Sequence, residues 1–257
     1  MENLAAAIND AADVALSNAM YRYTFGIVGN GEGGLEGRGI GTGIGVSWRG
    51  QFLILTAAHT METTAYEQLY ILLPHESLVT PSSSIRTDWT LPASIGNTRV
   101  QFNDPQVLLD SDRDLAAFVL PSQALEQARR HFYSLDDSQT TPQPVAQIGF
   151  LGYPKATRLP VGLNFVATPY SSCGLMVAVP DGSDPDSQIA ISYPPTTSVD
   201  PHGVSGSGLW LPTSVTEGLW TPEVSLVGLV THYDPQPQVL LGYRVEELVT
   251  FLKTNLV

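Results

Sequence analysis

The sequence predicts an all-β fold, because turn-forming residues are frequent, charged residues are few and short apolar segments recur along the chain. The 257 residues include 23 glycines and 19 prolines, and only 14% are charged, which suits many short strands joined by turns. This length accommodates one large all-β domain or two small barrels, with enough apolar residues for a core.

Residues 2–20 are predicted to form an N-terminal helix. Small and apolar side chains such as Leu16 recur on one stripe of this segment, and polar residues such as Asp10 lie opposite. We expect the stripe to pack across a barrel. A strand over Tyr21–Val28 follows, and Gly29–Gly41 is a glycine-rich loop.

The next strands are predicted to place a histidine at the end of a hairpin. Ile44–Trp48 and Phe52–Ala57 are predicted as two strands joined by Arg49-Gly50-Gln51, so His59 follows directly after a strand end. Loops at strand ends commonly carry functional residues on a rigid scaffold. The remaining elements expected in this half are strands over Leu69–Leu73, Thr98–Phe102 and Leu115–Leu120, a helix over Ser122–Phe132 and a polar linker over Ser134–Pro144.

The second half is predicted to contain seven strands and a closing helix. The strands are expected over Val145–Phe150, Gly162–Thr168, Leu175–Val179, Gln188–Ser192, Gly208–Leu211, Leu226–Thr231 and Val239–Tyr243. The helix is expected over Val245–Leu256. We find no internal sequence repeat, so the residues themselves do not indicate two copies of one unit.

Three short fragments carry candidate residues for acyl transfer by a serine. They are Thr56-Ala57-Ala58-His59, Asp114-Leu115-Ala116 and Gly203-Val204-Ser205-Gly206-Ser207-Gly208. A serine nucleophile needs an imidazole that takes its proton and a buried carboxylate that holds the imidazole in one tautomer. The order His, Asp, Ser along the chain differs from the orders of α/β-hydrolases and subtilisin-like enzymes.

Asp114 is selected among three neighbouring aspartates because an apolar strand follows it directly. Asp110 and Asp112 are expected to be the more exposed alternatives. The three aspartates also match the start of a calcium loop, but the glycine and the later glutamate of such a loop are missing. We therefore expect no metal.

The three fragments and the C-terminal segment resemble the trypsin/chymotrypsin-like serine proteases. Residues 226–231 and 243–249 are similar to the last strand and the C-terminal helix of that family. The resemblance implies two six-stranded antiparallel β-barrels with an N-terminal and a C-terminal helix. It also implies an endopeptidase that acts through a His59-Asp114-Ser205 triad and an acyl-enzyme, without a cofactor. The implied units are an N-terminal helix at 1–20, a first barrel at 21–133, a linker at 134–144, and a second barrel with the closing helix at 145–257.

The resemblance also assigns an oxyanion hole. Ser205 is preferred over Ser207 because it follows Gly203 at the interval that the family uses to aim two backbone N–H groups at one point. Those donors belong to Gly203 and Ser205. A side chain at position 203 would hinder the backbone conformation that turns this N–H inward, so glycine has a physical reason to be there.

Two departures from the family concern activation and specificity. Family members often pair a new N-terminus with an aspartate before the serine, but Val204 cannot form that ion pair. Ile27-Val28 is therefore expected to be simply strand. Matching the family's pattern assigns the substrate-binding edge and pocket to Val199, Thr231, His232, Tyr233 and Leu240. We expect a shallow apolar pocket for residues such as Ala or Val, or an acidic side chain recognised by His232.

Composition restricts the partners and the compartment. A net charge of −13 with only 12 Lys plus Arg argues against nucleic acid, and no segment is long and apolar enough for a membrane span. Cys173 is the single cysteine, so no intramolecular disulfide can form, and the first residues lack the pattern of a secretory signal. We expect a cytoplasmic protein whose partner is a protein or peptide substrate.

Three functions fit these residues: an active endopeptidase, a catalytically inactive binding or scaffold protein of the same fold, and an esterase that uses the same triad. The complete set of candidate triad and oxyanion residues favours the first. Without a zymogen device, activity would be restrained by narrow specificity, by a regulatory partner protein or by an inactive resting geometry. The sequence does not choose among these three.

Overall fold

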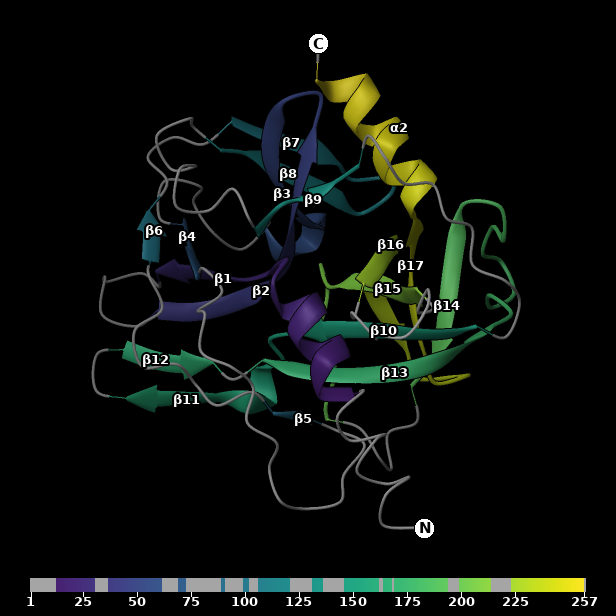
Figure 1. Cartoon of the computed structure of the whole chain (residues 1–257), viewed down its shortest axis with the longest axis horizontal. Coiled ribbons are helices and arrows are strands. Elements are labelled where there is room, and N and C mark those ends of the chain that lie inside the picture. The colour runs from purple at the N-terminus through teal and green to yellow at the C-terminus, as the bar shows by residue number, and fades with distance from the viewer. Residues whose placement is uncertain are drawn as a thin grey trace, which may run out of the picture.

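The protein is built mainly from antiparallel β-sheet, which confirms the predicted all-β class. The computed structural model describes residues 13–30, 37–61, 69–72, 89–90, 99–101, 106–120, 131–135, 146–161, 164–167, 169–193, 199–213 and 223–256. The described strands form two large sheets and a separate two-stranded hairpin. Helical segments stand near both ends of the chain (Figure 1).

The N-terminal sheet has eight strands, and a barrel is not confirmed for it. Its path runs β6-β4-β1-β2-β3-β8-β7, and β9 pairs with β2. The bounds are β1 Thr24–Asn30, β2 Gly37–Trp48, β3 Gln51–Ala57, β4 Leu69–Leu72, β6 Arg99–Gln101, β7 Gln106–Asp110, β8 Leu115–Val119 and β9 Tyr133–Ser134. Among the described residues no pairing joins β6 to β7, so the predicted first barrel is present here only as an open sheet.

The C-terminal sheet closes into a six-stranded antiparallel barrel. The ring runs β10-β15-β16-β17-β14-β13, and β13 pairs back with β10. The bounds are β10 Gln147–Gly152, β13 Tyr170–Val177, β14 Gln188–Ser192, β15 Gly208–Thr213, β16 Glu223–Asp234 and β17 Val239–Arg244. A short strand from the first half of the chain, β5 (Trp89–Thr90), also pairs with β13.

One predicted barrel strand lies outside the barrel. The segment Gly162–Thr168 corresponds to β12 (Asn164–Ala167), which pairs with β11 (Arg158–Val161) in a separate hairpin. The strand β13 begins at Tyr170 instead of the predicted Leu175. This longer strand pairs with both β10 and β14, so the barrel closes without β12.

The predicted hairpin before His59 is confirmed, with a shorter turn. Trp48 pairs with Gln51, so the turn consists of Arg49 and Gly50 and excludes the third residue that the sequence suggested. Their φ angles of 48° and 77° match a two-residue type I′ turn, which suits the twist of the flanking strands. This register ends β3 at Ala57, immediately before a single 3₁₀ turn over Ala58–Thr60.

The N-terminal helical segment packs on the closed barrel. Residues 13–21 are helical and lie across β10 and β13 (Figure 1). Met20 is buried in one cluster with Leu151 of β10, and the hydroxyl groups of Ser17 and Ser171 are hydrogen-bonded at 2.8 Å. The predicted packing across a barrel is confirmed for these residues, whereas positions 1–12 lie outside the described residues.

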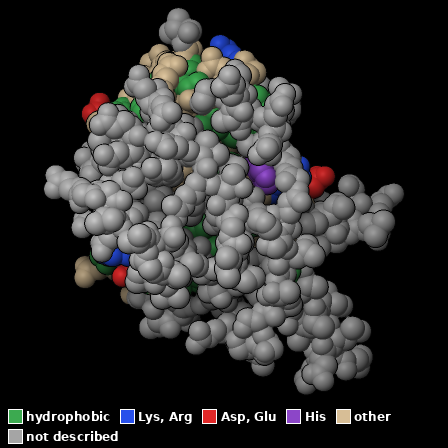
Figure 2. All heavy atoms as spheres, turned by 90° about the vertical axis from the view of Figure 1, so that its left-hand side faces the viewer, with side chains coloured by type: hydrophobic (Ala, Val, Ile, Leu, Met, Phe, Trp, Pro, Cys, Tyr) green, Lys and Arg blue, Asp and Glu red, His purple; other side chains and the backbone are tan. Residues whose placement is uncertain are grey.

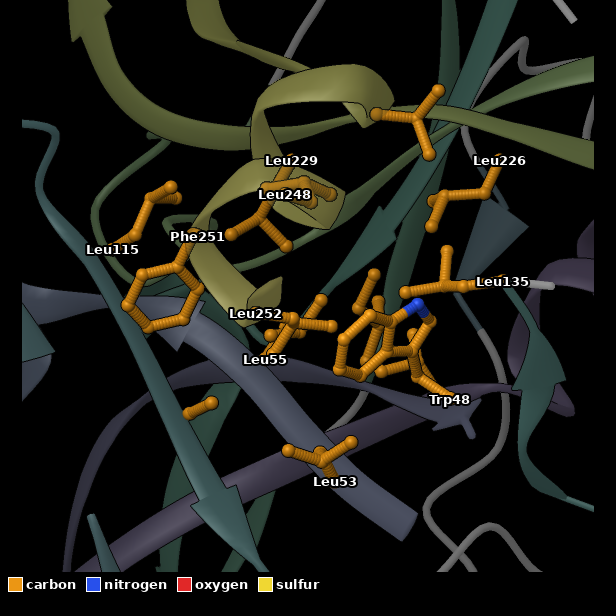
Figure 3. Packing of buried hydrophobic residues seen from close by; sticks show 14 of the residues in the cluster. Trp48, Leu53, Leu55, Leu115, Leu135, Leu226, Leu229, Leu248, Phe251 and Leu252 are labelled. Atoms are coloured by element: carbon orange, nitrogen blue, oxygen red, sulfur yellow. The ribbon is translucent and has the colours of Figure 1, made fainter. Parts of the chain in front are cut away.

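The helix α2 (Val245–Asn255) follows β17 directly and connects the two sheets. Phe251 and Leu252 share a buried cluster with Leu55 of β3 and Leu115 of β8 (Figure 3). Burying side chains of this size stabilises the fold by about 1.5–3 kcal/mol each. Among the described helical segments, none is long and apolar enough to cross a membrane.

Two predicted connecting elements lie mostly outside the described residues. Of the predicted helix Ser122–Phe132, only His131 and Phe132 are described. Of the predicted linker Ser134–Pro144, Ser134 belongs to β9 and Leu135 follows it. The boundaries proposed between the units therefore stay predictions.

Candidate active site

His59 and Asp114 lie side by side because two neighbouring strands end there. Ala57, the last residue of β3, pairs with Leu115, the first residue of β8. His59 follows β3 and Asp114 precedes β8, so the register of this one pair brings both side chains to the same edge of the sheet. The backbone confirms the proximity, since Ala58 N–H donates to Asp114 O at 3.0 Å.

Asp114 holds His59 through both of its carboxylate oxygens. Asp114 Oδ2 lies 2.7 Å from His59 Nδ1, and Asp114 Oδ1 accepts the backbone N–H of His59 at 2.8 Å. An ionised carboxylate only accepts hydrogen bonds, so Nδ1 carries a proton and a neutral ring keeps a lone pair on Nε2. This arrangement prepares His59 to take a proton at Nε2.

The turn that carries Asp114 is fixed by neighbouring contacts. Asp114 has a φ of 52°, a left-handed conformation that aspartate adopts more readily than most residues. Arg113 donates to Asp110 at 2.9 Å and forms an ion pair with Glu247 of α2 at 3.2 Å. Asp110 is therefore engaged with Arg113, and Asp114 is the aspartate of this run that contacts His59.

Ser205 is the second residue of the latter of two consecutive tight turns, 201–204 and 204–207. Val204 N–H donates to Pro201 O, and Ser207 N–H donates to Val204 O, each at 2.9 Å. Gly203 and Gly206 occupy the third positions of these turns with φ angles of 95° and 89°, as type II turns require. Among the described residues, neither Gly203 N–H nor Ser205 N–H donates a hydrogen bond to a backbone acceptor.

The serine loop rests directly on strand β2, next to the turn that carries His59. Thr42 N–H donates to Ser205 O at 3.2 Å, and the Thr42 hydroxyl donates to Gly203 O at 2.8 Å. A Cβ on Gly41 would lie 2.8 Å from Thr60 Cγ2 and 3.5 Å from Ser205 O. The backbone of β2 is thus in contact with the serine loop on one hand and with the residue after His59 on the other.

Replacing Gly206 with alanine is expected to lower the free energy of unfolding by about 2–5 kcal/mol. An alanine Cβ would lie 1.9 Å from Thr42 O, and the φ of 89° is left-handed. Gly182→Ala is the matched control, because Gly182 has a φ of 88° with no heavy atom within 4 Å of the added Cβ. Thermal unfolding followed by circular dichroism measures both variants, and an equal loss in the two would contradict the close packing of the serine loop on β2.

The residues predicted for the primary pocket lie around one wall of the barrel. Tyr233 pairs with Leu240 across β16 and β17, and Leu240 is buried. Val199 is partly buried against the same cluster, and its C=O accepts the hydroxyl proton of Tyr193. These three predicted residues therefore share one apolar environment inside the barrel wall.

The other two predicted pocket residues lie on β16, the strand that holds the serine loop. Val230 exchanges two backbone hydrogen bonds with this loop, accepting from Gly206 N–H at 2.7 Å and donating to Ser207 O at 2.8 Å. Thr231 comes next and is buried, whereas His232 is exposed. Of the pair, His232 is the one whose side chain is accessible to a ligand.

Charged side chains are dispersed around these elements. On the face shown in Figure 2, the described acidic and basic side chains lie as separate spots and form no continuous patch. Within the ranges that the structure describes, no three His, Cys, Asp or Glu side chains are grouped as a metal site. Asp110 and Asp114 contact Arg113 and His59 respectively, so these carboxylates do not converge on one point.

Thr42 and Thr56 are site residues that the sequence pattern did not indicate. The Thr56 hydroxyl donates to Thr42 O at 2.7 Å, and it lies 3.2 Å from the Thr60 hydroxyl. All three threonines are buried. Buried hydroxyl groups are usually hydrogen-bonded, and these three threonines follow that rule.

Comparison with known proteins does not show a family for this chain. No known family model and no curated protein matches it. One similar solved structure comes from work on how aromatic interactions drive the coupled folding and binding of the intrinsically disordered Sesbania mosaic virus VPg protein. The identity is 14%, the match covers 90% of each chain and the TM-score is 0.46. A likeness this weak assigns neither family nor function.

Proposed function

We propose that this protein is a serine endopeptidase, in which Ser205 is the nucleophile, His59 is the general base and Asp114 orients His59. The observation that carries the proposal is the double contact of Asp114 with His59, 2.7 Å from Nδ1 and 2.8 Å from the backbone nitrogen. A carboxylate in this position orients the ring and stabilises the imidazolium that forms during acyl transfer. The serine loop next to the histidine turn supports the same assignment.

The proposed reaction uses these residues in two steps. Ser205 Oγ attacks the peptide carbonyl carbon while its proton passes to His59 Nε2, and the carbonyl electrons move to the oxygen. The N–H groups of Gly203 and Ser205 would stabilise that oxyanion. As the C–N bond breaks, His59 gives the proton to the leaving amine. Water then hydrolyses the acyl-enzyme through the same groups.

The proposal extends to the fold family and to activation. Closure of the N-terminal sheet into a second barrel would give the two-barrel fold of the trypsin/chymotrypsin-like proteases, with the site between the barrels. Val204, the residue before the nucleophile, is 1% exposed and packs in the barrel core. An apolar residue in this position supports activity that does not depend on an ion pair with a new N-terminus.

The substrate and setting are proposed from the same residues. A shallow apolar pocket for a protein or peptide substrate is proposed at Val199 and Tyr233, which are partly exposed and pack against the buried Leu240. The exposed His232 supports an acidic side chain as the second choice. The single cysteine, Cys173, suits a reducing, cytoplasmic compartment. The charge of −13 supports partners other than nucleic acid.

A fluorophosphonate probe tests the proposal, and we expect covalent labelling of Ser205 at neutral pH. Burial raises the pKa of the Cys173 thiol to about 11, so at pH 8 about one thiol in a thousand is ionised and reactive. Pretreatment with iodoacetamide should therefore leave the labelling unchanged. Mass spectrometry of the digested protein locates the adduct.

Each other outcome of this experiment has a definite meaning. Folded protein that takes up no probe would contradict the proposal and favour the inactive binding or scaffold protein. Labelling that iodoacetamide blocks would indicate a cysteine nucleophile. Labelled protein that hydrolyses esters but no member of a peptide library would favour the esterase.

A further inference from the structure

We propose that Thr42 and the backbone N–H of Lys155 are positioning groups that hold the oxyanion turn, residues 201–204, in its active shape. This inference rests on the proposed function, because it assigns the oxyanion hole to the Gly203 and Ser205 N–H groups. Val204 cannot form the ion pair with a new N-terminus that trypsin-like proteases use next to the serine. Other contacts must therefore keep the Gly203 N–H directed at a substrate.

The shape of the turn decides where the Gly203 N–H points. Type I and type II turns differ mainly by a flip of the peptide between the second and third residues, which here joins His202 to Gly203. His202 has a negative φ and Gly203 has a φ of 95°, so the turn is type II. In a trans peptide the C=O and N–H point in opposite directions, and a flip would turn the Gly203 N–H away from Ser205.

Lys155 holds this peptide in one orientation. The backbone N–H of Lys155 donates to His202 O at 2.6 Å. Lys155 begins the short 3₁₀ turn Lys155–Thr157, shortly after β10 of the closed barrel. Because the acceptor is the C=O of the 202–203 peptide, the bond fixes the Gly203 N–H on the opposite side of the turn.

Thr42 holds the next peptide of the same turn. Its hydroxyl accepts the backbone N–H of Tyr153 and donates to Gly203 O, each at 2.8 Å. A backbone N–H can only donate, so the hydroxyl must accept from Tyr153 and direct its own proton to Gly203. Thr42 is fully buried, which removes water as a competing partner.

Thr42 also joins the turn to the elements that carry the triad. Its N–H donates to Ser205 O at 3.2 Å, and its C=O accepts the hydroxyl proton of Thr56 at 2.7 Å. Thr56 belongs to β3, the strand that ends just before His59. One residue of β2 therefore contacts the nucleophile, the oxyanion turn and the strand that leads to the base.

The test compares Thr42→Val, which removes the hydroxyl group at similar size, with Thr42→Ser, which keeps it. With p-nitrophenyl acetate as substrate, we expect Thr42→Val to lower kcat by about 10- to 100-fold and to change KM by less than about 3-fold. Thr42→Ser should restore most of the rate. The pH at which activity is half-maximal should stay the same in both variants, because neither change touches the His59–Asp114 pair.

A second pair of variants keeps the inference testable if Thr42→Val does not fold. Lys155→Pro removes the N–H that donates to His202 at a position where a helical turn begins and proline is tolerated. Lys155→Ala removes the side chain and keeps that N–H. We expect Lys155→Pro to lose about 10- to 100-fold in kcat and Lys155→Ala to lose much less.

The outcomes separate this inference from the proposed function. Folded wild-type protein that neither reacts with a fluorophosphonate probe nor hydrolyses p-nitrophenyl acetate would overturn the proposed function. Active wild-type protein together with full activity in folded Thr42→Val and Lys155→Pro would overturn the positioning roles alone. A loss in Thr42→Val that Thr42→Ser does not restore would assign the effect of Thr42 to packing instead of its hydroxyl.

Discussion

Replacing Ser205 with alanine is expected to lower the rate of peptide hydrolysis by about 10⁴-fold or more. The change removes the oxygen of the proposed nucleophile and little else, because the backbone C=O of Ser205 makes the contact with Thr42 N–H. The turns around Ser205 depend on backbone hydrogen bonds and on Gly203 and Gly206. The fold should therefore be kept. Steady-state hydrolysis of a fluorogenic peptide library measures the rate, and circular dichroism measures the fold.

Ser207→Ala is the matched control for this experiment. Ser207 is the other serine of the loop, it is fully buried, and its Oγ has no hydrogen-bond partner among the described residues. Removing a buried hydroxyl group without a partner should cost no stability. We expect the wild-type rate for Ser207→Ala. Wild-type activity in Ser205→Ala would show that another residue is the nucleophile.

Replacing Asp114 with asparagine is expected to lower kcat by about 10⁴-fold while leaving the site geometry nearly unchanged. Asparagine can keep its oxygen on the backbone N–H of His59, where Asp114 Oδ1 now accepts at 2.8 Å. Its NH₂ group would then face His59 Nδ1, which lies 2.7 Å from Oδ2. A donor in that position favours the tautomer with hydrogen on Nε2, and that tautomer cannot accept the proton of the serine.

Asp112→Asn is the control, because Asp112 is an exposed member of the same aspartate run. It changes the net charge by the same amount and should keep the wild-type rate. The two variants are compared through the pH dependence of kcat/KM and through their thermal unfolding. Equal rates in Asp114→Asn and in the wild type would remove Asp114 from the mechanism, and a large loss in Asp112→Asn would point to a general effect of charge.

The contact between His59 and Asp114 was accessible from the sequence because each residue borders a strand with a clear apolar pattern. The small residues before His59 and the apolar run after Asp114 define β3 and β8, and these strands are neighbours. Selection of Asp114 over Asp110 followed from that apolar run. The structure pairs Asp110 with Arg113 instead, a contact that depends on the shape of the turn.

The arrangement of the sheets was less accessible, because it depends on distant pairings. β7 was not predicted, since it is a short strand at the edge of the described sheet with a half-exposed Leu109. β12 lies outside the barrel because β13 already begins at Tyr170 and pairs with β10 from that residue on. Neither property is encoded in a local pattern, whereas the hairpin turn at Arg49-Gly50 is.

The role of Thr42 lay beyond the reach of the sequence for a related reason. A threonine on a strand is ordinary, and β-branched residues are common there. Its partners, Tyr153 and Gly203, are 111 and 161 positions away along the chain. Only the packing of both the serine loop and the segment after β10 against β2 brings them together.

The position of α2 means that the surroundings of His59 and Asp114 are completed by the last described element of the chain. Phe251 and Leu252 belong to the same buried cluster as Leu55 and Leu115. These two leucines lie on β3 and β8, the strands next to His59 and Asp114. Glu247 secures the turn before Asp114 through Arg113. During translation these residues leave the ribosome after every residue of the proposed triad. A nascent chain therefore contains the residues of the proposed triad before it contains the helix that packs against the strands next to His59 and Asp114.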